Sequence, residues 1–251
     1  SSPLIATVLL SATAINELGS EEQKQEFLPR IVAGELLFSL AIDEHTTHAP
    51  SRIETTAVKS DSGYVLDGKK TFVLDAHVAD KLIVVARTSG SRDSENGISL
   101  FIVDAKSEGV NISRTSMVDC RNAGNIEFNK VQLSELALLG SCDEAFAGLN
   151  KTLDIARIGI AAEMLGSIQQ VFDLILDFLK QREQFGVLIG SFQGLQHRAA
   201  TMYSEIELCK SSVRAALSAL DNQESSESEI AELASIAKSK LSEVFFLVSN
   251  E

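Results

Sequence analysis

The first 35 residues carry apolar side chains at helical spacing. Residues 3–18 open on a proline and continue with Leu, Ile, Val and Ala at helical intervals, which predicts a buried helix. A second helix is expected to start at Ser20, because Gln23 stands three positions later and the two residues match a capping box. Pro29 and Gly34 are then expected to end this N-terminal helical region.

Between residues 36 and 138 the pattern changes to short runs rich in β-branched and aromatic residues. Such runs predict strands, and their spacing predicts a compact β-sandwich or barrel. Asp67 and Gly68 lie between two of the runs, and an Asp-Gly pair in this place predicts a hairpin turn. The stretch from Ser89 to Gly97 predicts an exposed loop. The predicted strand runs are residues 63–66, 70–74, 81–87, 98–103 and 126–133.

After Gly140 the apolar positions recur at three, four and seven residues, which predicts long helices in a bundle. The polar stretch 221–228 predicts a solvated connection between two of them. The last helix is still apolar at Glu251, and the first has no partner of its own, so we expect both ends to belong to larger domains. The predicted fold class is therefore α+β and multi-domain. Its parts are the end of an N-terminal helical domain (1–35), a central β-domain (36–138) and an incomplete C-terminal helical bundle (139–251).

The chain is acidic, with 35 Asp and Glu against 22 Lys and Arg and a formal net charge of -13. Nucleic acid is not an expected partner, because neutralising its phosphates needs clustered Lys and Arg. The apolar run Leu4–Leu10 is too short to cross a bilayer, so no membrane association is expected. Three cysteines without a close pair favour a reducing compartment and predict a cytoplasmic protein. His45 and His48 have no cysteine pair nearby, and no metal site is expected.

Four short sequence motifs are spread over nearly the whole chain. The most specific is Arg182-Glu-Gln-Phe-Gly186, which is followed six residues later by Phe192-Gln193. Three others accompany it: residues 19–30 with Gly34-Glu35, residues 68–76 with Ala79-Asp80, and residues 154–161. The second of these is similar to a G-x-K-x-W-I-T-N stretch, and the third to the start of a first bundle helix. Together the motifs resemble those of the acyl-CoA dehydrogenase family of flavoproteins.

The resemblance implies FAD as cofactor, with one set of contacts from the bundle. Arg182 offers a fork of donors suited to a pyrophosphate, Phe185 an apolar plate and Gln193 a hydrogen-bonding amide. In the family these positions meet an FAD held mainly by a neighbouring subunit, which implies a homo- or hetero-oligomer, dimer or tetramer. The alternative for each residue alone is a solvated arginine or a core phenylalanine on an ordinary helix. The implied contacts of this segment are Arg182, Gln184, Phe185, Phe192 and Gln193.

A second set of implied FAD contacts lies in the β-domain, where the chain departs from the family pattern. Ile42 and Asp43 stand in the region of the family's Thr-Glu-Pro run. Phe72 replaces the usual Trp, and Leu74 replaces the Thr expected near flavin N5. Backbone N–H groups could serve as donors in place of the lost hydroxyls. An ionised Asp43 directed at a reduced flavin would be unfavourable, so its carboxylate is expected to face elsewhere.

The resemblance also implies a reaction, the introduction of a 2,3-double bond into an acyl-CoA thioester. A carboxylate would remove the α-proton while flavin N5 accepts the β-hydride, and an electron-transfer flavoprotein is an implied acceptor. The base is expected beyond Glu251, because no Tyr-Glu-Gly-Thr-like segment is present and the alternative slot before Arg157 holds Ala156. Asp154 and Arg157 are implied substrate contacts or, alternatively, a local helix ion pair. Two other functions remain open: a non-catalytic subunit that completes a partner's flavin site, and an acyl-CoA oxidase.

Overall fold

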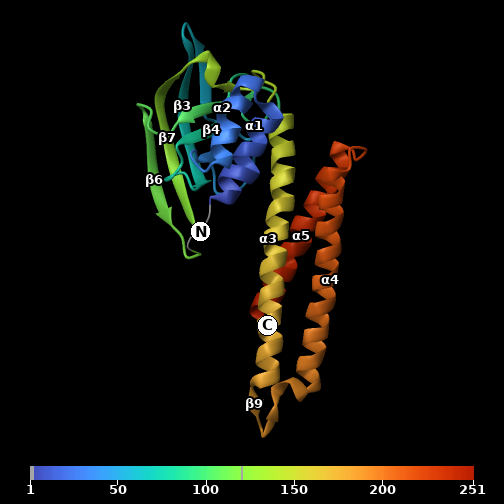
Figure 1. The fold of residues 1–251 in the computed structure, drawn as a ribbon. Coiled ribbons are helices and arrows are strands. Elements are labelled where there is room, and N and C mark those ends of the chain that lie inside the picture. Colours follow the sequence, from blue (N-terminus) through green and yellow to red (C-terminus); the bar gives the residue numbers. More distant parts are fainter. Residues whose placement is uncertain (1–2, 120) are drawn as a thin grey trace. The chain divides into compact units, whose positions relative to one another are not determined.

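The computed structural model describes residues 3–119 and 121–251, and it divides into two compact units. The first unit extends to residue 153 and combines helices with a sheet, and the second begins at residue 154 and is helical apart from a small hairpin. The predicted α+β fold class is confirmed. The two units are described in turn (Figure 1).

The first unit opens on three helical segments. A π-helical stretch η1 (Leu4–Ala12) leads into α1 (Thr13–Leu18), and α2 (Glu21–Val32) follows. The predicted capping box is present, because Gln23 N donates to Ser20 Oγ and Ser20 N donates to the Gln23 side chain. The α2 helix continues past Pro29 and ends at Val32.

The strands of the first unit form one eight-stranded sheet with the order β6-β7-β3-β2-β4-β5-β8, and β1 pairs with β4 in parallel. A single residue pair, Thr56 with Arg87, joins β2 to β4, whereas β3 and β7 pair along most of their length. The strands are β1 (Phe38–Ala41), β2 (Thr56–Ser60), β3 (Gly63–Leu74), β4 (Lys81–Arg87), β5 (Ile98–Asp104), β6 (Val110–Ser116), β7 (Asn122–Leu133) and β8 (Leu138–Leu139), with the 3₁₀ turn η2 (Glu135–Ala137) before β8.

The predicted hairpin turn at Asp67-Gly68 is wrong. Both residues lie inside the continuous strand β3, and the β2–β3 hairpin instead turns between Ser60 and Gly63. Gly68 has φ +144, and the register with β7 shifts beside it. A Cβ at Gly68 would lie 2.7 Å from Thr55 Cα, so glycine allows a close backbone approach here rather than a reversal of the chain.

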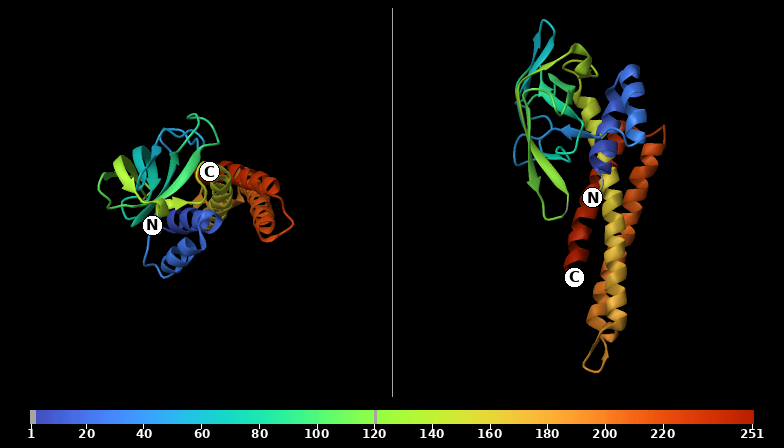
Figure 2. Two further views of the ribbon diagram at one scale, coloured as in Figure 1. Left: turned by 90° about the horizontal axis from the view of Figure 1, so that it is seen from above. Right: turned by 60° about the vertical axis from the view of Figure 1, so that its left-hand side comes forward.

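Both faces of β4 and β5 are buried, which explains their nearly continuous apolar sequences. Ile83 and Val85 pack with the opening helices in one cluster, and Leu82 and Val84 face a second cluster formed mainly with β3 and β7. Figure 2 shows the helices on one side of this sheet. Arg87, at the end of β4, holds the loop before β2 and the loop after β4. Its guanidinium donates to carbonyl oxygens of Ser51, Ile53, Arg92, Ser94 and Asn96.

The second unit contains three long helices that run side by side (Figure 1). They are α3 (Phe146–Gln181, which begins in the first unit), α4 (Gln193–Asp221) and α5 (Glu227–Asn250). A hairpin of β9 (Glu183–Gln184) and β10 (Val187–Leu188) and the 3₁₀ turn η3 (Ile189–Ser191) connect α3 to α4. By length and composition α3 would be able to cross a membrane, a criterion that core helices also meet. Its apolar side chains share a core with α4 and α5, including Ile158, Phe172, Ile206, Cys209 and Leu241.

Two cysteines are free thiols in the described part of the chain, Cys142 and Cys209. Burial, the largest influence, raises the pKa of the Cys209 thiol to about 11, so this residue behaves as a small apolar core side chain. Cys120 lies outside the described residues.

Candidate functional site

An open groove of about 790 Å³ lies in the first unit, where the loop after β1 faces strands β3, β6 and β7. Its size is within the range usual for small-molecule sites. Most of its lining residues carry hydroxyl, imidazole, amide or carboxylate groups, and Phe72 adds an exposed aromatic ring. The lining residues are Asp43, Glu44, His45, Thr46, Thr47, His48, Thr71, Phe72, Thr115 and Asn125.

Asp43 turns its carboxylate toward His48. His48 Nδ1 lies 2.9 and 3.1 Å from the two carboxylate oxygens, and Ala49 N donates to Oδ1 at 3.2 Å. The Asp43 carbonyl oxygen accepts from Thr71 N at 2.7 Å, which attaches this loop to β3. Ile42, the neighbouring implied contact, is buried in the helix-side core. The Asp43 side chain therefore contacts its own loop.

Phe72 and Leu74 lie at an irregular end of β3. The register with β7 shifts between Lys70 and Val73, and Phe72 adopts φ +53 with 57% of its surface exposed. Asn125 Oδ1 accepts from Phe72 N at 3.1 Å, so a side chain of β7 holds this unusual backbone. The Phe72 ring therefore stands at the groove surface, and Leu74, two residues later, is half-buried.

A buried ion pair lies behind the groove. Lys70 Nζ contacts Glu44 Oε1 at 2.7 Å and donates to the Ile42 carbonyl oxygen at 2.8 Å. The Glu44 carboxylate also accepts from the backbone N–H groups of Glu54 and Thr55. Every charged atom of the pair thus has a partner, as a buried charge requires.

The pair remains charged at neutral pH. Burial, the largest influence, lowers the pKa of Lys70 to about 8, although Glu44 opposes that shift. Burial also acts to raise the pKa of Glu44, but attraction to Lys70 and hydrogen bonds from Lys70 and Thr55 outweigh it, and the net pKa is lowered. The ionised pair joins the loop after β1 to the centre of β3.

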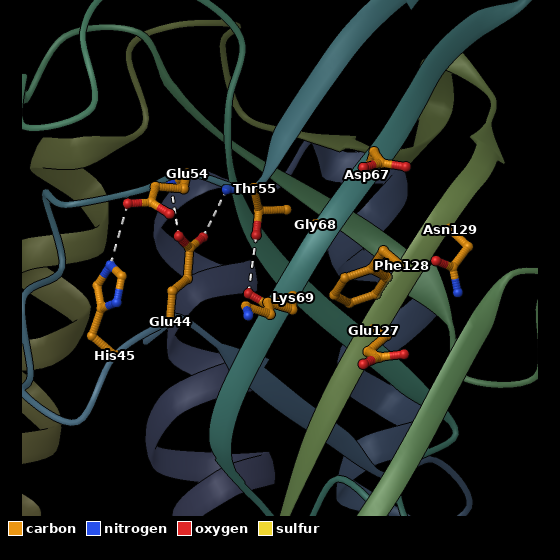
Figure 3. Close-up of a pocket in the computed structure, with 10 residues that line it drawn as sticks. All are labelled: Glu44, His45, Glu54, Thr55, Asp67, Gly68, Lys69, Glu127, Phe128 and Asn129. Carbon is orange, nitrogen blue, oxygen red and sulfur yellow. Dashed lines mark hydrogen bonds and ion pairs between the residues drawn. The ribbon is translucent and has the colours of Figure 1, made fainter.

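A smaller pocket of about 400 Å³ also borders Glu44 and His45 (Figure 3). Oxygen and nitrogen atoms of Glu44, His45 and Glu54 come within 4.8 Å of one another there, a spacing that could hold a metal ion. The two carboxylates are already engaged, however, because Glu44 accepts three hydrogen bonds and Glu54 pairs with Arg92 at 2.6 Å. The group is therefore better explained as an anchor for the loop than as a ligand set.

The implied FAD contacts of the bundle lie on and beside the β9–β10 hairpin. Arg182 is exposed at the end of α3, and its carbonyl oxygen accepts from Ile189 N at 2.8 Å. Phe185 has φ +56 at the hairpin turn and 93% of its surface is exposed. Its ring meets that of Phe192 edge-on, with the centroids 6.2 Å apart. Gln184 and Gln193 are exposed as well. The structure thus gathers these side chains in one small region.

Asp154 and Arg157 form an ion pair one helical turn apart on α3. The Asp154 side chain is 13% exposed and that of Arg157 34%. The local ion pair expected as one alternative is therefore present.

Comparison with known proteins assigns the chain to a family. Residues 43–131 match the acyl-CoA dehydrogenase middle domain, and residues 146–251 match the acyl-CoA dehydrogenase C-terminal domain. The chain belongs to the acyl-CoA dehydrogenase family. The two matches cover the groove and the hairpin segment, so the resemblance inferred from the motifs is confirmed.

Several known proteins are similar to this chain. The caffeyl-CoA reductase-Etf complex subunit CarC of Acetobacterium woodii is 33% identical, over 90% of this chain and 59% of its own. The short/branched chain specific acyl-CoA dehydrogenase of Rattus norvegicus is 35% identical, over 79% of this chain and 47% of its own. The structure of butyryl-CoA dehydrogenase from Megasphaera elsdenii matches with a TM-score of 0.89 and 30% identity, over 99% of this chain and 65% of that one. This chain thus spans less than two thirds of these relatives.

Some groove residues of this family member could not be found from sequence motifs. Thr115 on β6 and Asn125 on β7 enter the groove only because those strands pair beside β3. From the sequence, His48 is considered as a metal ligand and no contact with Asp43 is predicted, whereas the structure pairs the two residues. Their spacing of five residues in a loop is the one local signal that could have indicated the contact.

Proposed function

We propose that this chain is part of an FAD-dependent oxidoreductase that introduces a 2,3-double bond into an acyl-CoA thioester. The family match across both the groove-bearing domain and the bundle is the observation that carries the proposal. A bound flavin would supply the acceptor for the substrate's β-hydride. The catalytic base is expected outside this chain.

The residues of the groove fit the edge of a flavin ring. Phe72 presents an exposed aromatic surface, and hydroxyl groups of Thr46, Thr47 and Thr115 line the same space. These hydroxyls supply hydrogen-bonding groups that the sequence pattern lacks at positions 43 and 74. The groove would position the ring. The bonds of Lys70 to Glu44 and to the Ile42 carbonyl oxygen would fix the loop that forms one side of the groove.

The residues on and beside the β9–β10 hairpin fit the pyrophosphate and nucleotide part of FAD. Arg182 would bind a pyrophosphate, Phe185 would cover an apolar part of the nucleotide, and Gln193 would contact a nucleotide edge. Because Phe185 is 93% exposed in a single chain, a second subunit is the proposed source of the FAD it covers. The proposed assembly is an oligomer in the cytoplasm, with an electron-transfer flavoprotein as the proposed acceptor.

Two features favour a second candidate, a non-catalytic subunit that completes a partner's flavin site. Ala156 stands where some family members place a carboxylate, and Leu74 lacks the hydroxyl expected near the flavin. Such a subunit would keep the hairpin segment and bind no flavin of its own.

Purification of the full-length protein, together with any subunit that co-purifies, separates these functions. The enzyme is expected to carry one FAD per chain and to bleach at the flavin absorbance band when an acyl-CoA is added without oxygen. One FAD per two unlike chains would instead support the subunit function. Rapid recolouring in air, without another acceptor, would indicate an oxidase. A protein that retains no FAD after reconstitution would contradict the flavoprotein proposal.

A further inference from the structure

Asp43 and His48 form a pair in which the carboxylate contacts only one of the two ring nitrogens of His48. Both carboxylate oxygens of Asp43 lie within hydrogen-bonding distance of His48 Nδ1, at 3.1 and 2.9 Å. The contact requires a proton on Nδ1, because the ionised carboxylate can only accept. Half of the His48 side chain is exposed, against 28% for Asp43. The imidazole is therefore the outer member of the pair.

The second ring nitrogen of His48 is available to the groove. Nδ1 and Nε2 lie on different edges of an imidazole, so the contact with Asp43 leaves Nε2 directed away from that carboxylate. Among the described residues none bonds to Nε2 of His48. Because His48 lines the 790 Å³ groove with Phe72 and Asn125, a ligand in the groove can meet this atom.

The charge of the pair depends on His48. An imidazolium on Asp43 makes the pair neutral, and loss of the Nε2 proton leaves one negative charge. Glu44 is bound to Lys70, and the buried His45 Nε2 has no hydrogen-bond partner among the described residues, with Glu54 Oε1 3.5 Å away. Asp43 and His48 form the other charged pair among the lining residues.

We propose that protonated His48 compensates Asp43 at the flavin edge and so stabilises the negative charge that the ring acquires on reduction. The inference rests on the proposed function. A hydride carries two electrons and one proton, so its addition to neutral flavin leaves one negative charge on the ring. An uncompensated Asp43 would oppose that charge, whereas the neutral pair does not. His48 is thus assigned as a positioning and charge-balancing residue that replaces a hydroxyl contact.

The two-electron reduction potential of bound FAD tests the assignment in the full-length holoprotein. At pH 6, His48→Gln is expected to weaken the stabilisation of reduced flavin at least tenfold, which lowers the potential by about 30 mV. Asp43→Asn is expected to leave the potential unchanged or raise it. The double variant, which is neutral at both positions, should return to within about threefold of the wild-type equilibrium, about 14 mV.

His197→Gln is the control, because His197 is exposed on α4 and does not line the groove. Its potential should change by less than about threefold, about 14 mV.

Some results would contradict the charge-balancing role of His48 without contradicting the proposed flavoprotein function. If the wild type retains FAD but His48→Gln and Asp43→Asn shift its potential in the same direction, the charge-balancing role is wrong and the flavoprotein function stands. Loss of FAD from both His48→Gln and the double variant would assign His48 to loop structure and also overturn the inference. A wild type that binds no FAD would reject both the function and the inference.

Discussion

Lys70 and Glu44 form an ion pair almost completely excluded from solvent, with side-chain exposures of 0% and 3% and a separation of 2.7 Å. The pair links β3 to the loop that carries Asp43 and His48. Lys70→Met should destabilise the fold by about 3–5 kcal/mol, because it leaves the Glu44 charge buried without its partner. Chemical denaturation followed by circular dichroism measures this loss.

The matched control is the double variant Glu44→Gln/Lys70→Met. It removes both charges while keeping similar volumes. The N–H groups of Glu54 and Thr55 donate to different oxygens of Glu44, so the single amide oxygen of Gln keeps one of these two bonds. We expect it to recover more than half of the stability lost in Lys70→Met. A double variant as unstable as the single one would show that packing, rather than the unpaired charge, accounts for the loss.

Alkaline pH should increase the contribution of Lys70 to stability. Its pKa is 10.5 in the unfolded chain and about 8 in the folded protein, so between these values the unfolded chain binds more protons. The free energy of unfolding attributable to this group therefore rises with pH across that window and falls again as the pH returns through 8. Denaturation curves at pH 7.5, 9 and 10 should show this rise relative to Glu44→Gln/Lys70→Met. Parallel profiles for the two proteins would contradict it.

Arg182→Ala should weaken FAD binding about 10- to 100-fold, on the order of the loss of charge-assisted hydrogen bonds to a phosphate. Arg214→Ala is the control, because Arg214 is exposed on α4 in the same unit. Flavin fluorescence titration of the full-length apoprotein gives both dissociation constants. Equal affinity in the two variants would remove Arg182 from the proposed site.

Gly68→Ala should destabilise the first unit, because a Cβ would lie 2.7 Å from Thr55 Cα and φ is +144. Gly166→Ala provides the contrast. A Cβ at Gly166 meets nothing within 4 Å in the interior of α3, so this change is expected to stabilise by about 0.5–1 kcal/mol. Thermal unfolding of the two variants should shift in opposite directions. A Gly68→Ala protein as stable as the wild type would show that the backbone there can relax.

The sequence predicted the elements whose periodicity is long or whose signal is local. Helices α3 and α5 follow from long stretches of apolar spacing, and the Ser20–Gln23 box is a pattern of four residues. The Asp67-Gly68 pair led to a wrong turn prediction, because the same dipeptide occurs both in turns and at strand irregularities. The choice between them depends on Thr55, which is distant in sequence and crosses close to Gly68.

The site was less predictable than the fold for a related reason. Arg182 and Phe185 belong to a continuous motif and were named from it. The contact of Asn125 with Phe72 instead depends on β7 pairing with β3 at an irregular register. The direction of the Asp43 carboxylate depends on how a loop folds back on itself, which side-chain periodicity does not encode.

The Arg87 side chain forms hydrogen bonds to two separate loops. Its guanidinium donates to carbonyl oxygens at Ser51 and Ile53 on one side and at Arg92, Ser94 and Asn96 on the other. Neither loop can lift from the sheet without breaking bonds to the same planar group. Their amide hydrogens should therefore exchange with solvent at linked rates, as one cooperative opening rather than two independent ones.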